Sequence, residues 1–295
     1  MKLKIFSFAH KPVDFLTKLS QTIIPVGIGK SNFSKNWIDT NQGDNINHKH
    51  MAYAEMTGHY WVWKNFILKN LDEDIWVGFS QYRRHWLKYE PFKSRFYHSS
   101  FVHDFFKIFI KRLASSRLTS FSKYLVSAYK NYDYETIDPS MDTKYLQNFL
   151  LNKVGNDWGA YDVILPKPVF LGDNIKKQYF ESKDIPDQLI NQILFNMPIN
   201  LKNKFIYHLS NERYLSPHNM YIAKPKILNE YFSFAFDLYK KLENITNKET
   251  GLKIIDTPRF YGTLNERMAN FWFKDCKKFK TLPIRFLSNI EKSED

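Results

Sequence analysis

The sequence predicts one α/β domain in which a mixed, mostly parallel β-sheet is flanked by helices and carries a basic helical insert. Short apolar runs of strand length alternate with longer segments of helical spacing, which is typical of βαβ units. The 295 residues, 43% of them hydrophobic, suffice for a substantial core. Because there is neither an internal repeat nor a Pro- or Gly-rich linker, we assign residues 1–290 to one domain.

The first half of the chain supplies the opening strands. The expected elements are a strand at 2–9, a helix around 13–21, a strand at 25–27, a helix near 51–69 and a strand at 75–79. Asn47 is a candidate N-cap of the helix near 51–69, and Asn70 is a candidate for its end.

The second half follows a basic helical insert at about 91–150. We expect a helix near 143–153, strands at 162–165 and 220–223, helices near 226–243 and 259–273, and a strand at 278–283. Alternation of these elements again favours a mostly parallel sheet covered by helices.

The strand at 75–79 is followed by Gln81, Tyr82, Arg83 and Arg84, and we expect the two arginines to lie in the loop at its C-terminal end. In an open α/β sheet, ligands bind beyond the carboxyl ends of the strands. Paired guanidinium groups there suit bidentate binding of phosphate or carboxylate oxygens. The alternative is that both arginines pair with nearby acids on the surface.

A polar loop precedes the helix near 51–69. Asp44, Asn45 and Asn47 carry short carboxylate and amide side chains that can bond a ribose, a base edge or a sugar hydroxyl. The alternative is a loop rich in turn-forming residues without a ligand.

Several ordered blocks along the chain resemble the DUF4422 family. They are Gly43–Ile46, Tyr53–Thr57, Tyr60–Asn65, Gly78–Arg84, Tyr161–Pro166, His218–Ile222 and Arg259–Arg267. The family contains bacterial glycosyltransferases of capsule, exopolysaccharide and lipopolysaccharide gene clusters, some of them galactofuranosyltransferases. The family usually has His-Tyr-Arg-Arg where this chain has Gln81-Tyr82-Arg83-Arg84. This difference puts a catalytic histidine at that position in doubt. Residues 91–135 are also longer and more basic than the family leads us to expect.

The resemblance implies a GT-A-like fold and an inverting transfer from a UDP-sugar, with a UDP-furanose as the favoured donor, to a saccharide acceptor that can be lipid-linked. We expect Arg83, Arg84, Tyr82 and Lys64 to bind the donor diphosphate. We expect the nucleotide and the sugar to be bound by the residues His10, Asp44, Asn45, Asn47, Gln81, His218 and Asn219.

A GT-A enzyme usually holds a divalent metal with an Asp-x-Asp that follows a central strand. Asp72 and Asp74 have this spacing but precede the strand at 75–79, so a loop or capping role is favoured. We therefore expect no metal cofactor, with arginine charge in its place, and leave Mg²⁺ or Mn²⁺ open. His48, His50 and His59 cluster like metal ligands, yet no acidic or sulfur ligands accompany them, so we discount zinc.

An inverting transferase needs a base for the acceptor hydroxyl. Glu266 is the first candidate, because the catalytic carboxylate of GT-A folds commonly lies late in the chain near a helix start. The alternative is an ion pair of Glu266 with Arg259 or Arg267. Asp173 is the second candidate for the base.

The formal charge of +13 requires an explanation. Residues 91–130 hold eight Lys or Arg residues against one Asp, interleaved with aliphatic and aromatic residues, which is typical of an interfacial helix on anionic lipid. The alternative for this stretch is a helical hairpin packed on the core with a basic outer face. A basic scaffold that binds a polyanion or a membrane in a polysaccharide assembly system is the alternative function.

Nucleic acid is not favoured as a partner, because no recognition motif is present. The lone Cys276 excludes an internal disulfide. No signal peptide and no apolar run of membrane-spanning length are found, so we expect a cytoplasmic protein that can dock on the inner membrane.

Overall fold

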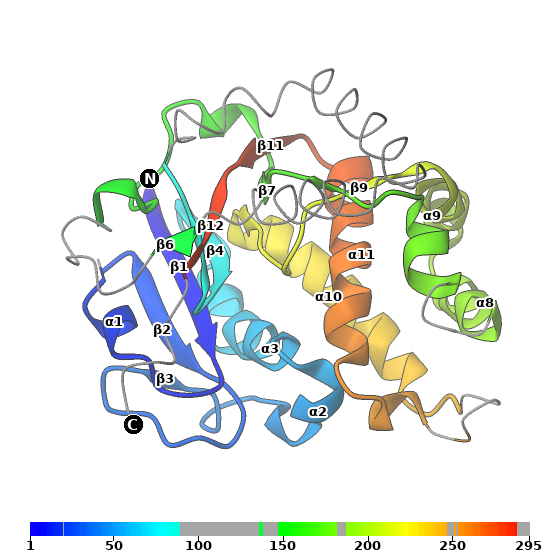
Figure 1. Ribbon diagram of the computed structural model, residues 1–295, viewed down its shortest axis with the longest axis horizontal. Coiled ribbons are helices and arrows are strands. Elements are labelled where there is room, and N and C mark those ends of the chain that lie inside the picture. The colour runs from blue at the N-terminus through cyan, green and yellow to red at the C-terminus, as the bar shows by residue number, and fades with distance from the viewer. Residues whose placement is uncertain are drawn as a thin grey trace, which may run out of the picture. The chain divides into compact units, whose positions relative to one another are not determined.

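The computed structural model describes residues 1–19, 21–88, 136–137, 147–181, 187–246, 251 and 253–287 (Figure 1). The chain divides into two units. The first unit comprises Met1–Tyr82 and Asn152–Thr281, and the second comprises Arg83–Leu151 and Leu282–Asp295. The assignment of 1–290 to one domain stays a prediction, and most of the insert at about 91–150 lies outside the described residues.

The apolar runs of the first unit form a mixed, mostly parallel sheet in the order β11-β7-β10-β4-β1-β2-β3. Its strands are β1 (Lys2–Ala9), β2 (Ile23–Gly27), β3 (Ile38–Asp39), β4 (Ile75–Gln81), β7 (Val163–Pro166), β10 (Ile222–Ala223) and β11 (Phe279–Leu282). Strands β4, β1, β2 and β3 run parallel, whereas β10 is antiparallel to both β4 and β7. The segment before β10 therefore lies at the same edge as the carboxyl ends of β1 and β4.

Helices cover the sheet on both faces (Figure 1). On one face lie α3 (Met56–Asn65), α10 (Pro225–Leu242) and α11 (Phe260–Cys276), and on the other lies the short α1 (Asp14–Thr17). Phe6, Phe8 and Phe79 alternate along β1 and β4 and are buried against the three-helix face. This alternation follows the period of two along a strand, and it fixes which side chains enter the larger core.

The remaining elements of the first unit connect the sheet and the helices. They are α2 (His50–Tyr53), α8 (Asp187–Asn196), α9 (Ile199–Asn211), β8 (Val169–Phe170), β9 (Tyr214–Leu215), the 3₁₀ helices Asn47–Lys49, Ile67–Lys69, Trp158–Ala160 and Ile254–Asp256, and the π-helix Lys176–Glu181. Within the second unit, β12 (Ile284–Leu287) pairs with β5 (Arg84–Trp86) and with β6 (Thr136–Ile137).

Most of the expected strands and long helices are confirmed, with four corrections. The expected helix 51–69 is broken, because Ala54 adopts φ 49° between α2 and α3. Asn47 does not cap α2; it opens a 3₁₀ turn, and its amide bonds Thr40 and Asn41 instead. Arg84 lies in strand β5 rather than in a loop, because the chain after Tyr82 pairs with β12. The helix expected to reach 153 ends earlier, where Leu150 pairs with Leu87.

Close packing between α3 and the sheet predicts a cost for any side chain at Gly58. A Cβ there would lie 2.5 Å from the Phe8 ring and 2.9 Å from Ile28 Cγ2, in a buried interface. We expect Gly58→Ala to lower the free energy of unfolding by about 2 kcal/mol through overpacking. Gly159→Ala is the matched control, because nothing lies within 4 Å of its Cβ position. Urea denaturation followed by tryptophan fluorescence measures both, and equal stabilities would contradict the packing argument.

Candidate functional site

Polar side chains gather at the carboxyl ends of β1 and β4 in the first unit. His10 follows β1, and its ring meets the Tyr82 ring edge-on with 5.2 Å between centroids. The Gln81 amide donates to the His218 carbonyl at 3.0 Å. Four of the residues predicted for the donor, namely His10, Gln81, Tyr82 and His218, therefore lie along one edge of the sheet, where open α/β folds bind ligands.

A turn before β10 brings His218 and Asn219 to this edge. Both residues have left-handed backbones, with φ 74° for His218 and 53° for Asn219. This conformation costs a non-glycine residue on the order of 1–2 kcal/mol, so the surroundings must hold it. The Glu266 Oε1 accepts the His218 backbone N–H at 2.8 Å, and together with Gln81 it fixes the first of the two residues.

Asn219 is fixed by a buried hydrogen-bond network. Its Nδ2 donates to Glu55 Oε1 and to the Gly262 carbonyl, both at 2.8 Å, and its Oδ1 accepts from Asn265 Nδ2 at 2.8 Å. The His59 ring lies between the Asn219 and Glu55 carbonyls, and burial lowers the pKa of His59 to about 4. Because every polar atom of the Asn219 side chain is bonded inward, the side chain holds the turn, and a sugar-binding role for Asn219 stays a prediction.

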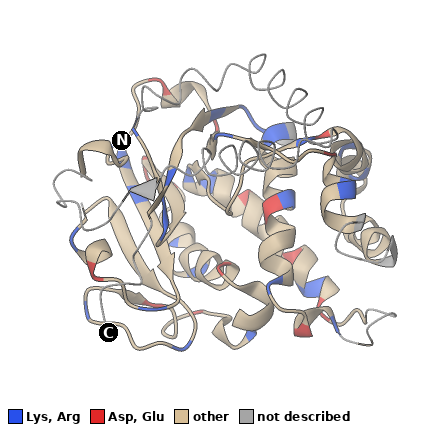
Figure 2. Cartoon of the chain, in the orientation of Figure 1, with Lys and Arg blue, Asp and Glu red and all other residues tan. Residues whose placement is uncertain are grey.

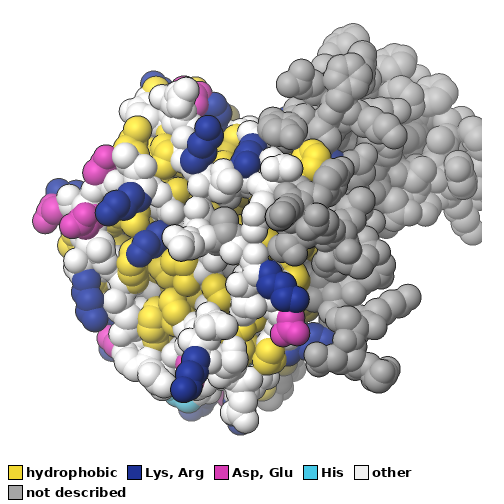
Figure 3. Space-filling model, turned by 90° about the vertical axis from the view of Figure 1, so that its left-hand side faces the viewer, with side chains coloured by type: hydrophobic (Ala, Val, Ile, Leu, Met, Phe, Trp, Pro, Cys, Tyr) yellow, Lys and Arg dark blue, Asp and Glu magenta, His cyan; other side chains and the backbone are white. Residues whose placement is uncertain are grey.

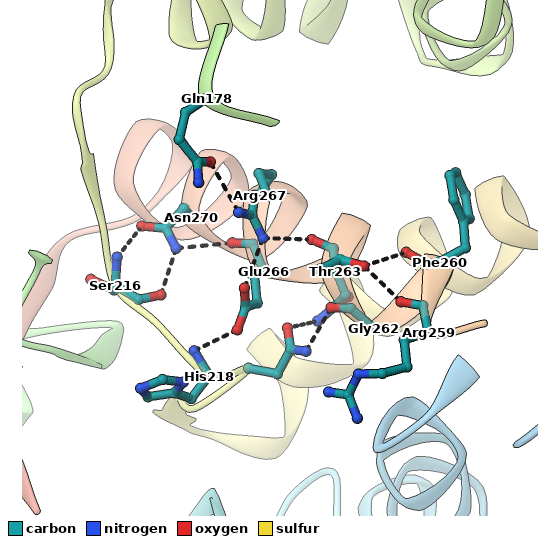
Figure 4. A network of polar contacts seen from close by, with 12 residues as sticks. Gln178, Ser216, His218, Arg259, Phe260, Gly262, Thr263, Glu266, Arg267 and Asn270 are labelled. Atoms are coloured by element: carbon teal, nitrogen blue, oxygen red, sulfur yellow. Dashed lines mark hydrogen bonds and ion pairs between the residues drawn. The ribbon is translucent and has the colours of Figure 1, made fainter. Parts of the chain in front are cut away.

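Glu266 has both carboxylate oxygens engaged (Figure 4). Oε1 accepts from His218, and Oε2 accepts from Arg267 Nη1 at 2.8 Å. Arg267 is 5% exposed and also donates to the Thr263 carbonyl and to Gln178. The ion pair that the sequence offered as an alternative role for Glu266 is therefore present with Arg267, whereas Arg259 contacts Glu55 at 3.4 Å.

The loop before α2 bonds mainly to itself and to α3. Asn47 Nδ2 donates to Thr40 and Asn41, Asn45 Nδ2 to the Gly43 carbonyl, and Asp44 Oδ1 accepts from the Tyr60 hydroxyl at 3.2 Å. These contacts are those of a loop of turn-forming residues. A nucleotide-binding role for the three side chains stays a prediction.

Arg83 and Arg84 belong to the second unit and are described with it. The Arg83 carbonyl accepts from the Leu287 N–H at 2.7 Å, and the Arg84 guanidinium lies 5.4 Å from the Phe286 ring centroid. Lys64, in the first unit, lies 3.8 Å from the Trp63 ring centroid on α3. Diphosphate binding by Arg83, Arg84 and Lys64 stays a prediction.

Asp173 lies in the bend that follows β8. Strand β8 is antiparallel to β9, and Phe170 is opposite Tyr214, so the chain after β8 runs away from His218. The Lys177 ammonium, 3.0 Å from the carboxylate, lowers the pKa of the exposed Asp173. The role of Asp173 as the second candidate base stays a prediction.

The Asp-x-Asp at 72–74 lies at the opposite end of β4. Asp72 pairs with Lys226 at 2.8 Å and Asp74 pairs with Lys224, and both acids are exposed. Among the described residues, no group of three His, Cys, Asp or Glu side chains has the arrangement of a metal site.

The sequence missed several residues of the site. Glu55, Asn265 and Arg259 occur inside the family-like blocks but were not assigned to the turn or to its edge. Arg259 has φ 57° directly before α11, and Figure 4 shows its side chain pointing away from that helix. Little in the sequence indicates these roles, because no motif marks a buried carboxylate such as Glu55 or a left-handed backbone at an arginine such as Arg259.

Comparison with protein families gives a match over residues 4–278 to DUF4422, described as a domain of unknown function. The chain belongs to the DUF4422 family. Comparison with the curated proteins gives no match. Among solved structures, this DUF4422 chain resembles the apo structure of WbbM, a bifunctional glycosyltransferase, with a TM-score of 0.68 and 22% identity. The alignment covers 98% of this chain and 46% of that one, so the chain spans about half the length of WbbM. This likeness confirms the predicted GT-A-like α/β fold.

None of the helices within the described part of this DUF4422 chain combines the length and hydropathy of a membrane-spanning segment. Acidic and basic residues are interspersed along α10 and α11 (Figure 2). On the face drawn in Figure 3, the coloured Lys and Arg side chains lie apart from one another, with hydrophobic side chains between them.

Proposed function

We propose that the protein is a glycosyltransferase that moves a sugar from a UDP-sugar to the acceptor of a growing capsular or surface polysaccharide. The observation that carries the proposal is the polar edge of the first unit, where His10, Gln81, Tyr82 and His218 meet at the carboxyl ends of β1 and β4. This edge belongs to a fold similar to that of a bifunctional glycosyltransferase. A galactofuranose-type sugar, a lipid-linked acceptor and membrane docking through residues 91–130 are further parts of the proposal.

The reaction requires stabilisation of the departing nucleoside diphosphate. Arg83 and Arg84 are proposed for this charge, because guanidinium groups bind phosphate oxygens in bidentate geometry. Tyr82 and Lys64 are proposed to assist. We propose that no metal ion is needed, and the experiment below tests this directly.

The acceptor hydroxyl must lose a proton in an inverting transfer. The contacts of Glu266 favour a positioning role, since its carboxylate holds the His218 turn and pairs with Arg267. The role of Glu266 as the base is the alternative, and the two roles predict different kinetics for the amide variant.

Calorimetric titration of UDP into the pure protein tests the proposal. We expect micromolar binding that survives excess EDTA and is lost in Arg84→Ala. Binding that requires Mg²⁺ would contradict the arginine model but support a nucleotide-sugar site. Absence of UDP binding with and without Mg²⁺ would contradict the proposed function.

A basic scaffold that binds a polyanion or a membrane is the second candidate. It is favoured by the charge of +13 alone. It predicts affinity for polyanions that falls steeply with salt and does not change in the Arg84→Ala variant. A UDP site that Arg84 controls would therefore exclude this candidate as the main function.

A further inference from the structure

His50 is a histidine at the ligand edge for which the proposed reaction has no role so far. It opens α2, and its Nε2 lies 3.4 Å from the position that a Cβ on Gly29 would occupy. Gly29 follows β2 with φ 82°, a conformation that favours glycine. The ring therefore lies against the backbone that leaves β2.

His10 lies on the neighbouring strand at the same edge. Ala9, the last residue of β1, accepts the Ile28 N–H at 2.9 Å, so the segments after β1 and β2 start side by side. The Ser31 hydroxyl then donates to the His10 carbonyl at 2.6 Å. His50 consequently belongs to the same edge as the residues predicted to bind the donor.

The Thr57 hydroxyl determines which nitrogen of His50 carries hydrogen. Thr57 Oγ1 lies 2.9 Å from the Ala54 carbonyl, to which it donates its single hydrogen. It lies 3.2 Å from His50 Nδ1 and can only accept there. Nδ1 must therefore be the protonated nitrogen, and in a neutral ring Nε2 carries a lone pair.

Burial, helped by two neighbouring basic groups, keeps the ring neutral. Burial lowers the pKa of His50, and His10 and Arg259 lower it further. Glu55 and the Ala54 carbonyl act in the opposite direction without reversing the shift. Because the pKa lies below the ordinary value of 6.5, the ring is neutral at pH 7.5.

Nε2 has no hydrogen-bond partner in the part of the chain that the structure describes, and the ring is only half-buried. A fixed lone pair at an accessible edge accepts a hydrogen bond from an N–H or O–H group. Uridine offers such donors at the uracil N3 and at the ribose hydroxyls.

We propose that His50 reads the nucleoside of the donor by accepting a hydrogen bond from it at Nε2. The proposal rests on the proposed function, because it takes the ligand to be a UDP-sugar. It makes His50 a specificity-determining residue rather than a zinc ligand or a phosphate ligand. A phosphate would need a proton on Nε2 and would favour the charged ring.

Calorimetric titration of UDP into wild type, His50→Gln, His50→Phe and His48→Gln tests the proposal. We expect His50→Phe to weaken UDP binding about tenfold, because a hydrogen bond in the site is lost. His50→Gln keeps an acceptor oxygen and is expected to stay within about threefold of wild type. His48→Gln is the matched control, because His48 is exposed two residues away, and it should bind as wild type does.

The pH dependence of UDP binding distinguishes a ligand-binding role of His50 from a purely structural one. Below its pKa, His50 gains a proton at Nε2 and loses its lone pair. We therefore expect wild type to lose UDP affinity relative to His50→Gln when the pH falls from 7.5 to 5. A relative gain for wild type would make His50 an anion ligand and overturn the proposal. This comparison applies even if His50→Phe fails to fold.

Ligand analogues identify the group that His50 reads. The probes are 2′-deoxy-UDP, 3′-deoxy-UDP and N3-methyl-UDP. One of them should weaken binding to wild type but leave binding to His50→Phe unchanged relative to UDP. If wild type binds UDP and no analogue shows this difference, the inference about His50 is wrong while the proposed function stands. No UDP binding by wild type would overturn the proposed function itself and the inference with it.

Discussion

Asn265→Ala is expected to lower the free energy of unfolding by about 4 kcal/mol. Asn265 is fully buried on α11, and its Oδ1 accepts from the Tyr231 and Tyr239 hydroxyls at 2.6 and 2.8 Å. Its Nδ2 donates to Asn219 Oδ1 at 2.8 Å. Truncation to alanine removes the hydrogen-bond partner of the two tyrosine hydroxyls and of Asn219 Oδ1. Each buried group that stays unsatisfied costs about 1–3 kcal/mol.

Urea denaturation measures the loss, with Asn203→Ala as the matched control. Asn203 lies exposed on α9, so its truncation is expected to change stability by less than about 0.5 kcal/mol. A loss below 1 kcal/mol for Asn265→Ala would mean that water or rearranged tyrosines replace its hydrogen bonds.

The parts of the fold that could be predicted are those that local sequence patterns determine. β1, β4, α10 and α11 depend on local patterns, namely apolar runs and helical spacing, and they are found within a few residues of their predicted bounds. α8 and α9 were missed although the signal was present. Leu201, Phe205 and Leu209 recur every four residues and are buried.

Other features depend on contacts between distant segments and leave no local pattern. The break after α2 occurs at Ala54, where no glycine or proline marks it. The left-handed turn at His218 and Asn219 likewise lacks glycine. It is held by the side chains of Glu266 and Asn265, both on α11. Single-sequence propensities cannot detect such a conformation, because its support comes from side chains far away in the chain.

The candidate site shows the same division. His10, Gln81 and Tyr82 could be placed at one edge, because each follows a predicted strand of a mostly parallel sheet. His218 precedes its strand and reaches the same edge only because β10 is antiparallel to β4, which the sequence did not predict. Sequence reasoning could not show that amides and carboxylates of the site bond inward. Their partners are set by packing, and packing decides whether a polar group faces a ligand or holds the backbone.

Glu266→Ala is expected to lower the free energy of unfolding by about 3 kcal/mol. The variant leaves Arg267, which is 5% exposed, without its carboxylate partner, and breaking one side of a buried ion pair costs roughly 3–5 kcal/mol. Glu266 is itself 19% exposed, so we expect the lower end of this range. Urea denaturation measures the loss. Glu230→Ala is the control, because Glu230 is 52% exposed in its pair with Lys277, and a pair with one exposed partner should contribute less than about 1 kcal/mol.

Steady-state kinetics with a UDP-sugar separates the two roles of Glu266. Glu266→Gln retains an oxygen that can accept the His218 N–H, so a positioning role predicts kcat within about tenfold of wild type. Glu266→Ala should then lose both UDP affinity and kcat, because the His218 turn is released. If Glu266 is the base, the Gln variant should instead lose kcat by about 10²–10⁴-fold with unchanged UDP affinity. The second pattern would contradict the positioning role, since the amide oxygen can still accept the His218 N–H but the amide cannot take a proton.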